Sequence, residues 1–365
     1  MDSWGGKGGT MMPATGPPPW EPAVQSSMRA AAIGTGGRLE IVERPEPQPG
    51  PGEVVVAVER CGICGSDLHL RASGLLPAGA VLGHEFGGPV VVAAPDGDGP
   101  AVGTLVSVLP ARRCGTCEAC TSGRSNLCPL QVTTSIGLGW RNGGYAERVV
   151  VPGSSCHPVP PHTTAAQAAL AEPYAVALHA IARSRMAADT DPAVAVIGAG
   201  SVGLMCVAAL VQAGVTRVAV AEPRTVRAAV ARAMGAVTVD RAGDIARALG
   251  RPPDVVFEAT GTAEAPGQAV ETAAIGGRVV LVGVGAPGGE VPMPALLWVV
   301  KEVDVVPSIA YTDAEFARAV AAVGNGAADK IVESAQHRRL ADAEQAFDDL
   351  RRPDGPVKVL LDPTR

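Results

Sequence analysis

The chain has 365 residues, of which 47% are hydrophobic and only 3% aromatic, and its formal net charge at pH 7 is −6. This length is enough for two ordinary domains, whose cores must be filled mainly by alanine, valine and glycine because aromatic residues are scarce. The acidic balance, without any block of lysine or arginine, argues against proteins that bind nucleic acids or anionic membrane surfaces.

Residues 1–27 are rich in glycine and proline, and they contain no apolar stretch behind a basic start, so they do not resemble a secretory signal. This composition is typical of a disordered tail. We therefore expect a folded structure from Met28 onward and a reducing, cytoplasmic location, where disulfides are rare.

From Met28 to about residue 174, the chain consists of short apolar or alternating runs that glycine and proline separate. Such a pattern predicts a β-rich domain with long loops. The clearest strand runs are residues 54–58, 90–94, 105–109 and 148–152.

Near residue 193 the pattern changes, and strand runs begin to alternate with helical segments. The strand runs are residues 193–197, 217–221, 237–239, 255–257, 278–282 and 303–306. The helical segments between them are residues 202–212, 225–234, 244–249 and 266–272. This alternation predicts a parallel, doubly wound α/β sheet. The expected elements beyond it are helices at 313–323 and 341–350 and a strand at 357–361.

No charged residue occurs between Asp191 and Arg217, so this stretch imitates a membrane span in length and apolar character. Three glycines interrupt its apolar part at residues 193–211, however, and a β-rich half precedes a helix-like half. A buried strand followed by a buried helix explains the stretch better, and we expect no membrane-spanning segment.

A glycine pattern, G-x-G-x-x-G, follows the strand run at 193–197 and opens the next helix. In dinucleotide-binding folds the first glycine allows a tight turn, the second lets the backbone approach the pyrophosphate, and the third packs helix against strand. A purely structural turn in another α/β fold is the alternative. The predicted cofactor site consists of Gly198, Gly200, Ser201, Val202 and Gly203.

The second strand of this sheet ends at Glu222, where dinucleotide-binding folds place an acidic residue. A carboxylate there binds the ribose hydroxyls and repels a 2′-phosphate, so NAD is favoured over NADP. Arg224 and Arg227 lie just beyond and could accept that phosphate, or they could be ordinary surface cations. We include Arg227 in the cofactor site and keep NADP as the alternative.

Four of the eight cysteines occur within fifteen residues, at Cys114, Cys117, Cys120 and Cys128. The bacterial ferredoxin pattern is similar, but it ends with a shorter spacing and requires a second set of cysteines. Four thiolates in one loop can close a tetrahedral shell around a structural zinc ion. We therefore expect residues 112–130, called the cysteine lobe below, to bind structural zinc.

A second group of metal-ligand types lies earlier, at Cys64, His84 and Glu85. Cysteine and histidine form a ligand pair that zinc prefers, and a site with an open position beside its protein ligands is catalytic. Taken alone, His84 could be a structural histidine and Cys64 a small buried packing residue. Their presence in a chain that also binds a dinucleotide favours a metal site.

Five motifs in order, "CGICGSDLH", "GHE", the cysteine lobe, "AEPYAVALHA" and "GAGSVG", resemble the zinc-dependent medium-chain dehydrogenase/reductase family. The similarity is to its alcohol, sorbitol and threonine dehydrogenase branch, and it extends from Met28 to Arg365. It implies an α/β protein with a GroES-like β-rich catalytic domain at 28–176, completed by 308–365. A doubly wound Rossmann NAD(P)-binding domain would lie between them, at 177–307.

The resemblance also implies a set of catalytic zinc ligands. The cysteine that ends "CGIC" is Cys64, and the histidine of "GHE" is His84. The third position is a glutamate before proline in sorbitol-type members, and Glu172 occupies it here, directly or through water. Glu85 matches a carboxylate that can enter or leave the zinc shell.

By the same resemblance, zinc lowers the pKa of the substrate hydroxyl, and hydride moves to the nicotinamide. Ser66 accepts the hydroxyl proton, which passes toward His69 and water. Cys61, Cys156 and Cys206 match no ligand position and are expected to be packing residues.

Glutamate in the third-ligand position indicates a secondary alcohol substrate such as a polyol, sugar, cyclitol or amino alcohol, with the matching ketone as product. Trp140, Tyr174 and Trp298 are expected at the pocket by family position, or as residues that merely fill gaps. The resemblance implies two zinc ions per chain, and a homodimer or homotetramer by analogy. The alternatives are an NADP-dependent alcohol or aldehyde reductase and a non-catalytic, zinc-stabilised binding protein.

Overall fold

The structure, a computed structural model, describes residues 26–187, 190–285 and 289–365. The predicted disordered tail therefore lies outside the described residues except for its last two positions. The second of these, Ser27, begins the first strand, one residue before the expected start of the fold.

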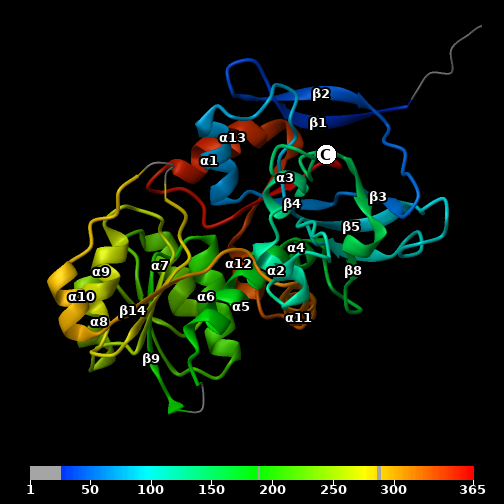
Figure 1. The fold of residues 1–365 in the computed structure, drawn as a ribbon. Coiled ribbons are helices and arrows are strands. Elements are labelled where there is room, and N and C mark those ends of the chain that lie inside the picture. Colours follow the sequence, from blue (N-terminus) through cyan, green and yellow to red (C-terminus); the bar gives the residue numbers. More distant parts are fainter. Residues whose placement is uncertain (1–25, 188–189, 286–288) are drawn as a thin grey trace, which may run out of the picture.

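The first part of the chain, together with two strands from its C-terminal end, folds into two sheets (Figure 1). The short strand runs predicted a β-rich domain here. The strands are β1 (Ser27–Ile33), β2 (Leu39–Pro45), β3 (Glu53–Ala57), β4 (Arg60–Gly62), β5 (Glu85–Val92), β6 (Leu105–Val108), β7 (Arg148–Pro152), β8 (Cys156–Pro158), β15 (Gln336–Arg339) and β16 (Val359–Asp362). β1 and β2 form an antiparallel hairpin. The larger sheet has the order β15-β16-β4-β5-β3-β7, with β6 paired to β5 and β8 paired to β6.

Helices and short turns connect these strands. They are α1 (Gly65–Ser73), α2 (Glu118–Thr121), η1 (Ser125–Leu127), α3 (Gln131–Thr134), η2 (Gly153–Ser155), α4 (Ala165–Ala169), α5 (Ala171–Ser184), α11 (Asp313–Gly324), α12 (Asp329–Ser334), η5 (Leu340–Asp342) and α13 (Ala343–Arg351). The proposed domain boundary at residue 176 falls inside α5, so a continuous helix leads from one domain to the other.

The middle of the chain forms the parallel sheet that the strand–helix alternation predicted. Its strands are β9 (Ala193–Ile197), β10 (Arg217–Ala221), β11 (Val237–Val239), β12 (Val255–Glu258), β13 (Arg278–Leu281) and β14 (Asp304–Pro307). Their order is β11-β10-β9-β12-β13-β14, and every pair is parallel. The other elements are α6 (Ser201–Gln212), α7 (Thr225–Ala233), η4 (Ala242–Asp244), α8 (Ile245–Leu249), α9 (Ala265–Thr272) and α10 (Ala295–Lys301).

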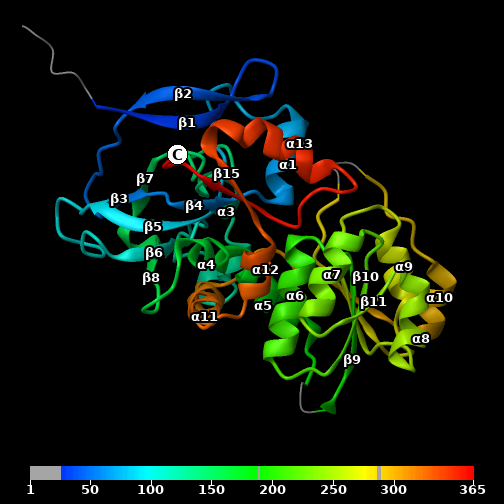
Figure 2. The ribbon, with the colours of Figure 1, turned by 180° about the vertical axis from the view of Figure 1, so that it is seen from behind.

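Both faces of this parallel sheet are buried, which explains why its strands are continuous apolar runs. In β9, Val194 and Val196 belong to the core that includes α5 and α6, whereas Ala195 and Ile197 belong to the core under α8 and α9. Helices therefore cover both faces of the sheet (Figure 2). No helix in the described part of the chain is long and apolar enough to cross a membrane.

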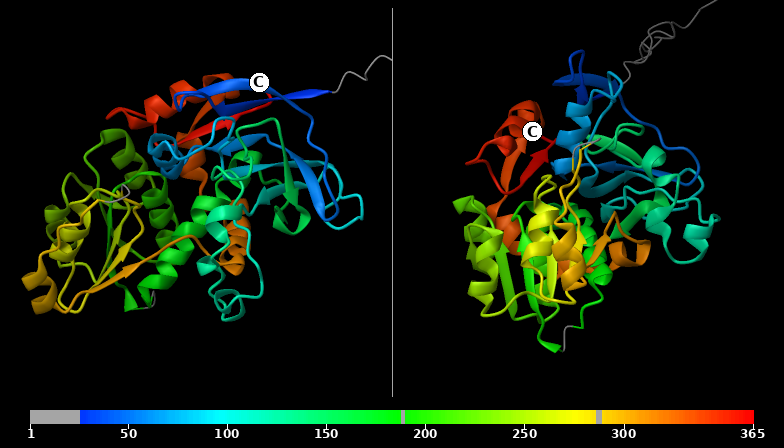
Figure 3. Two further views of the ribbon diagram at one scale, coloured as in Figure 1. Left: turned by 45° about the horizontal axis from the view of Figure 1, so that its top comes forward. Right: turned by 60° about the vertical axis from the view of Figure 1, so that its left-hand side comes forward.

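The C-terminal elements return to the β-rich domain (Figure 3). β16 pairs antiparallel with β4, and Leu361 lies opposite Cys61. Phe347 of α13 and Leu361 are buried in the same core as Ala30 of β1. The β-rich domain is thus built from two segments that the parallel-sheet domain separates in sequence.

Candidate active site

Two neighbouring strands bring the predicted ligands Cys64, His84 and Glu85 together. β4 and β5 are antiparallel, and Gly62 at the end of β4 lies opposite Glu85 at the start of β5. The residues just after β4 and just before β5 therefore lie at the same end of these two strands. As a result, the ligand atoms of Cys64, His84 and Glu85 lie within 4.8 Å of one another.

Asp67 orients two of these ligands, although the sequence analysis did not single it out. Its buried Oδ2 accepts hydrogen bonds from the backbone N–H of Cys64 (2.9 Å) and from the hydroxyl of Tyr145 (2.7 Å). Its Oδ1 lies 3.3 Å from Nδ1 of His84. The other ring nitrogen, Nε2, is then free for a metal and lies 3.3 Å from Oγ of Ser66.

The protonation of His84 depends on these neighbours. Burial lowers the pKa of His84, but the Asp67 carboxylate and the Cys64 sulfur outweigh burial and raise it well above the ordinary value. A metal at Nε2 must displace a proton from the metal-free ring. Metal binding here should therefore weaken as the pH falls.

Glu85 has a second buried partner that was not predicted. Its Oε2 contacts Nζ of Lys358, and both side chains are completely buried. Its Oε1 is buried without a hydrogen-bond partner among the described residues. An unpaired carboxylate oxygen is costly in a protein interior, and a metal ion beside Cys64 and His84 would satisfy it.

Glu172 lies outside this group of three. It is buried at the start of α5, where its Oε1 accepts a hydrogen bond of 2.9 Å from the hydroxyl of Tyr311. Burial and, to a smaller extent, the carboxylate of Glu85 raise the pKa of Glu172 to about 7. Its place as a zinc ligand stays a prediction, and Tyr311 is a partner that the sequence did not reveal.

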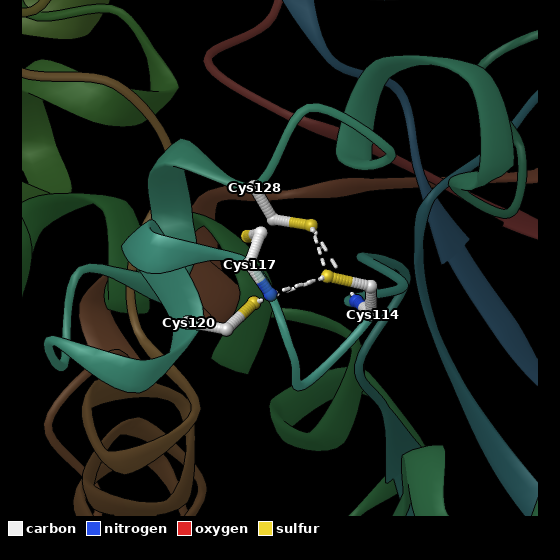
Figure 4. Close-up of side chains that lie close together, drawn as sticks. All are labelled: Cys114, Cys117, Cys120 and Cys128. Carbon is white, nitrogen blue, oxygen red and sulfur yellow. Dashed lines mark hydrogen bonds between the residues drawn. The ribbon is translucent and has the colours of Figure 1, made fainter.

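The four cysteines of the lobe converge (Figure 4). Sγ of Cys114 lies 3.9 Å from Sγ of Cys120 and 3.7 Å from Sγ of Cys128. These distances are too long for a disulfide, whose S–S length is about 2.05 Å. They match the S–S spacing of about 3.8 Å that follows from tetrahedral zinc with Zn–S bonds of about 2.3 Å.

Backbone amides of the lobe point at the sulfurs. The N–H of Cys117 donates to Sγ of Cys114 (3.2 Å), and the N–H of Cys114 donates to Sγ of Cys128 (3.4 Å). Backbone hydrogen bonds from Thr116 and Cys117 lower the pKa of Cys114 to about 6. The same amides would stabilise thiolates that bind a metal.

The other three cysteines that were considered for ligand positions are buried elsewhere. Burial raises the pKa of Cys61 well above its ordinary value and raises those of Cys156 and Cys206 to about 12. They are therefore neutral thiols at physiological pH, in agreement with their predicted role as packing residues.

A cleft of about 1200 Å³ connects the two predicted sites. From the β-rich domain it is lined by Cys64 and His69. From the parallel-sheet domain it is lined by Gly198, Gly200, Ser201, Val202, Glu222 and Arg227. Cys64, one of the candidate metal ligands, and the dinucleotide turn thus face one continuous space.

The glycine turn has the geometry that the pattern predicted. Gly198 has a φ of +93°, a backbone angle that residues with a side chain rarely adopt. A Cβ atom on Gly203 would lie 1.9 Å from the carbonyl oxygen of Gly198, so only glycine lets α6 approach β9 this closely.

Glu222 and three arginines surround the expected ribose position. The buried carboxylate of Glu222 accepts hydrogen bonds from the backbone N–H groups of Ala199 and Arg224, each of 2.9 Å. Arg224, Arg227 and Arg241 line the same cleft. Burial, with a smaller contribution from Arg224, lowers the pKa of Arg227. An anionic group would therefore find both a fixed carboxylate and nearby cations here.

The aromatic residues expected at the pocket lie elsewhere. Tyr174 is buried in the core, whereas Trp140 is 64% exposed. Trp298 is partly exposed, and its Nε1 donates to the carbonyl of Val303. None of the three is among the described residues that line the cleft. The expectation that they form the substrate pocket finds no support.

Comparisons with known proteins agree with this site. The model of the alcohol dehydrogenase GroES-like domain matches residues 50–161, and that of the zinc-binding dehydrogenase matches residues 201–325. The sorbitol dehydrogenase of Bacillus subtilis (strain 168) is 30% identical over 303 residues, which is 80% of this chain and 84% of that protein. The (R,R)-butanediol dehydrogenase of the same strain is 33% identical over 349 residues, 89% of this chain and 96% of that one.

The chain belongs to the zinc-dependent medium-chain dehydrogenase family. A zinc-binding dehydrogenase of Sinorhizobium meliloti 1021, solved with NADP bound, superposes on it with a TM-score of 0.84 and 33% identity. The match covers 93% of this chain and 100% of the other. The family assignment confirms the GroES-like and Rossmann domains, and it makes the protein an NAD(P)-dependent alcohol dehydrogenase with zinc as its metal. The alternative of a non-catalytic binding protein is therefore wrong.

Proposed function

We propose that the protein oxidises a secondary alcohol, in a polyol, sugar, cyclitol or amino alcohol, with NAD as the hydride acceptor. The observation that carries this proposal is the single cleft that Cys64 and His69 share with the glycine turn and Glu222. Two relatives are named for sorbitol and butanediol, alcohols with more than one hydroxyl group, and they support the substrate class.

Two zinc ions per chain complete the proposal. The cysteine lobe would hold the structural ion, since its sulfur spacing fits tetrahedral zinc. Cys64, His84 and Oε1 of Glu85 would hold the catalytic ion at rest, because they are already grouped and that oxygen has no partner within the described part of the chain. Glu172 is the alternative third ligand.

The protein's own groups would handle the proton released by the alcohol. When bound, zinc supplies Lewis-acid polarisation of the substrate hydroxyl, and the nicotinamide supplies the hydride acceptor. Oγ of Ser66 lies 3.3 Å from Nε2 of His84, beside the proposed metal position, and would take the hydroxyl proton. Ser66 and His69 are three residues apart on α1 and so share a face of that helix. His69 is exposed and lines the cleft, and it would pass the proton to water.

NAD would be preferred over NADP because the negative charge of the buried Glu222 carboxylate would repel the 2′-phosphate of NADP. The second candidate is an NADP-dependent reductase, which Arg224, Arg227 and Arg241 favour because they line the same cleft. The deciding experiment follows nicotinamide reduction by near-ultraviolet absorbance, with NAD and NADP, against polyols, sugars, cyclitols, amino alcohols and simple alkanols. Turnover with simple alkanols alone, or with NADP alone, would contradict the proposal.

We also propose a homodimer that forms through the edge of the parallel sheet. β14 is the last strand of that sheet, and the neighbouring α10 exposes Leu296, Val299 and Val300 by 80%, 74% and 66%. An unpaired edge beside exposed apolar side chains is suited to a second copy of the chain. Light scattering of wild type and of Leu296→Glu tests this proposal: a monomeric wild type would refute it, and a tetramer would require a second interface.

A cytoplasmic location completes the proposed function. The cysteine lobe can bind zinc only while its thiols stay reduced, which a reducing compartment ensures. Cell fractionation tests this location directly.

A further inference from the structure

The segment 309–315, which precedes and begins α11, makes hydrogen bonds to the cysteine lobe. The guanidinium of Arg113 donates to the backbone carbonyl of Tyr311 (2.6 Å) and also contacts the carboxylate of Asp313. The side-chain amide of Asn126 donates to the backbone carbonyl of Ile309 (3.1 Å). The lobe therefore holds this segment at both its beginning and its middle.

The same segment makes two hydrogen bonds to α5. The hydroxyl of Tyr311 donates to Oε1 of Glu172 (2.9 Å), and Glu315 lies 3.0 Å from Nδ1 of His179. Glu172 and His179 are seven residues apart, close to two helical turns, so both lie on the face of α5 that meets the segment. Tyr311 and Glu315 are correspondingly four residues apart.

A further contact links the lobe to α5 directly. Nδ2 of Asn126 lies 3.3 Å from Nε2 of His179. Since an amide nitrogen only donates, Nε2 of His179 accepts, and Nδ1 carries the proton that is shared with Glu315. One neutral tautomer of His179 thus satisfies both partners.

The residues that make these contacts stand next to the metal ligands of the lobe. Arg113 directly precedes Cys114, and Asn126 lies two residues before Cys128. The side chain of Arg113 is only 6% exposed, and Asn126 is buried, so water does not compete for their hydrogen bonds. The position of the cysteines therefore determines where both side chains can reach.

We propose that the cysteine lobe positions Glu172 at the catalytic metal site, with Arg113 and Asn126 as positioning residues that act through segment 309–315. This inference rests on the alternative given under the proposed function, in which Glu172 is the third ligand of a metal held by Cys64 and His84. The lobe then has a role beyond stability, because its contacts hold the Tyr311 hydroxyl against the Glu172 carboxylate.

The test uses a double-mutant cycle on the full-length, zinc-loaded protein. Arg113→Gln removes one of the two links between the lobe and segment 309–315 and leaves that of Asn126 in place. Tyr311→Phe removes only the hydroxyl that contacts Glu172. The readout is the rate at which a chelator removes the catalytic zinc, with Cys64→Ala identifying the release from the lobe itself. Arg112→Gln is the matched control, because Arg112 is the exposed neighbour of Arg113.

Each single variant should release the catalytic zinc about 10-fold faster than wild type, the size of effect typical for residues that orient metal ligands. The double variant should be no faster than Tyr311→Phe, because both substitutions break the same chain of contacts. Arg112→Gln should match wild type. Tyr311→Phe leaves the lobe intact, so its release rate stays informative if Arg113→Gln fails to fold.

Unchanged release in Tyr311→Phe would overturn the inference. So would multiplicative effects in the double variant, or an Arg113→Gln protein that loses thermal stability but keeps its catalytic zinc. A wild-type protein that binds one zinc ion would overturn the proposed function together with this inference. Two bound ions with unaffected release would overturn the positioning role alone.

Discussion

Nζ of Lys358 contacts Oε2 of Glu85 in a position where neither side chain has any exposed surface. The lysine also donates to the carbonyl of Ile63 (3.0 Å). Burial lowers the pKa of Lys358, but the charge of Glu85 outweighs burial, and the net effect is a raised value. The lysine therefore stays protonated inside the protein and fixes one oxygen of Glu85, whereas the other oxygen has no hydrogen-bond partner among the described residues.

Replacing Lys358 with methionine should destabilise the protein strongly. An isolated buried carboxylate would remain, and the loss of one partner of such a pair typically costs about 3–5 kcal/mol. Urea unfolding measures this loss. Lys330→Met, in an exposed pair with Glu333, should cost less than about 1 kcal/mol. The double variant Lys358→Met/Glu85→Gln should recover part of the stability, and equal losses for Lys358 and Lys330 would contradict this account.

The two cysteine groups should respond differently to substitution. Cys64→Ala should abolish turnover and remove one zinc ion while the thermal unfolding temperature changes little, because the surrounding strands stay paired. Cys117→Ala should mainly lower the unfolding temperature, since the lobe has little core of its own. Zinc content and thermal unfolding of both variants check this division. Equal loss of folded structure in the two would refute it.

Glu222→Ala should change cofactor preference. Loss of hydrogen bonds to a charged group, each about 1.5–3 kcal/mol, should weaken NAD binding roughly 10- to 100-fold and NADP binding much less. Fluorescence titration with both dinucleotides measures the ratio. Glu222→Gln is the control for the two backbone N–H bonds, because it keeps the shape and one acceptor oxygen. An unchanged ratio in Glu222→Ala would place the ribose contact elsewhere.

Glu315 should make stability depend on pH in the acid range. Burial raises its pKa, but hydrogen bonds from His179 and from the backbone N–H of Thr312 outweigh burial and hold the pKa below 4.5. A carboxyl with a lowered folded-state pKa adds stability above its unfolded pKa, and this contribution is lost as the pH falls through the folded value. Glu315→Gln should therefore cost about 1–3 kcal/mol at neutral pH and progressively less below about pH 4.5. Thermal unfolding across this range measures the difference; Glu333→Gln, an exposed control, should show almost none.

The sequence predicted the elements and ligands that depend on local patterns. The parallel sheet follows from alternating apolar runs, and the cysteine lobe and the glycine turn follow from spacing within one loop. The sequence analysis missed Asp67, although a signal for it existed. Asp67 stands at the third position of the helix that begins after Cys64, where an acidic side chain can accept a hydrogen bond from the backbone N–H of the residue before the helix.

Lys358, Tyr145 and Tyr311 could not be assigned in the same way. A lysine inside the apolar run at 357–361 is unusual, but the run contains nothing that identifies Glu85 as its partner. Tyr145 and Tyr311 reach the site from loops, whose paths depend on packing across the whole domain. For Trp140, Tyr174 and Trp298 the sequence left two interpretations open, a pocket position or gap filling, since family position alone does not determine which way a side chain points.

The distance in sequence between Glu85 and Lys358 has a consequence for the order of events during synthesis. The two residues are 273 positions apart, and the entire parallel sheet is translated between them. All strands of that sheet lie between the two residues, so it can fold as a unit while translation continues, whereas the core that contains β4 and β5 must wait for β16. Until then Glu85 has no counter-charge, and metal loading at Cys64 and His84 belongs to the last stage of maturation.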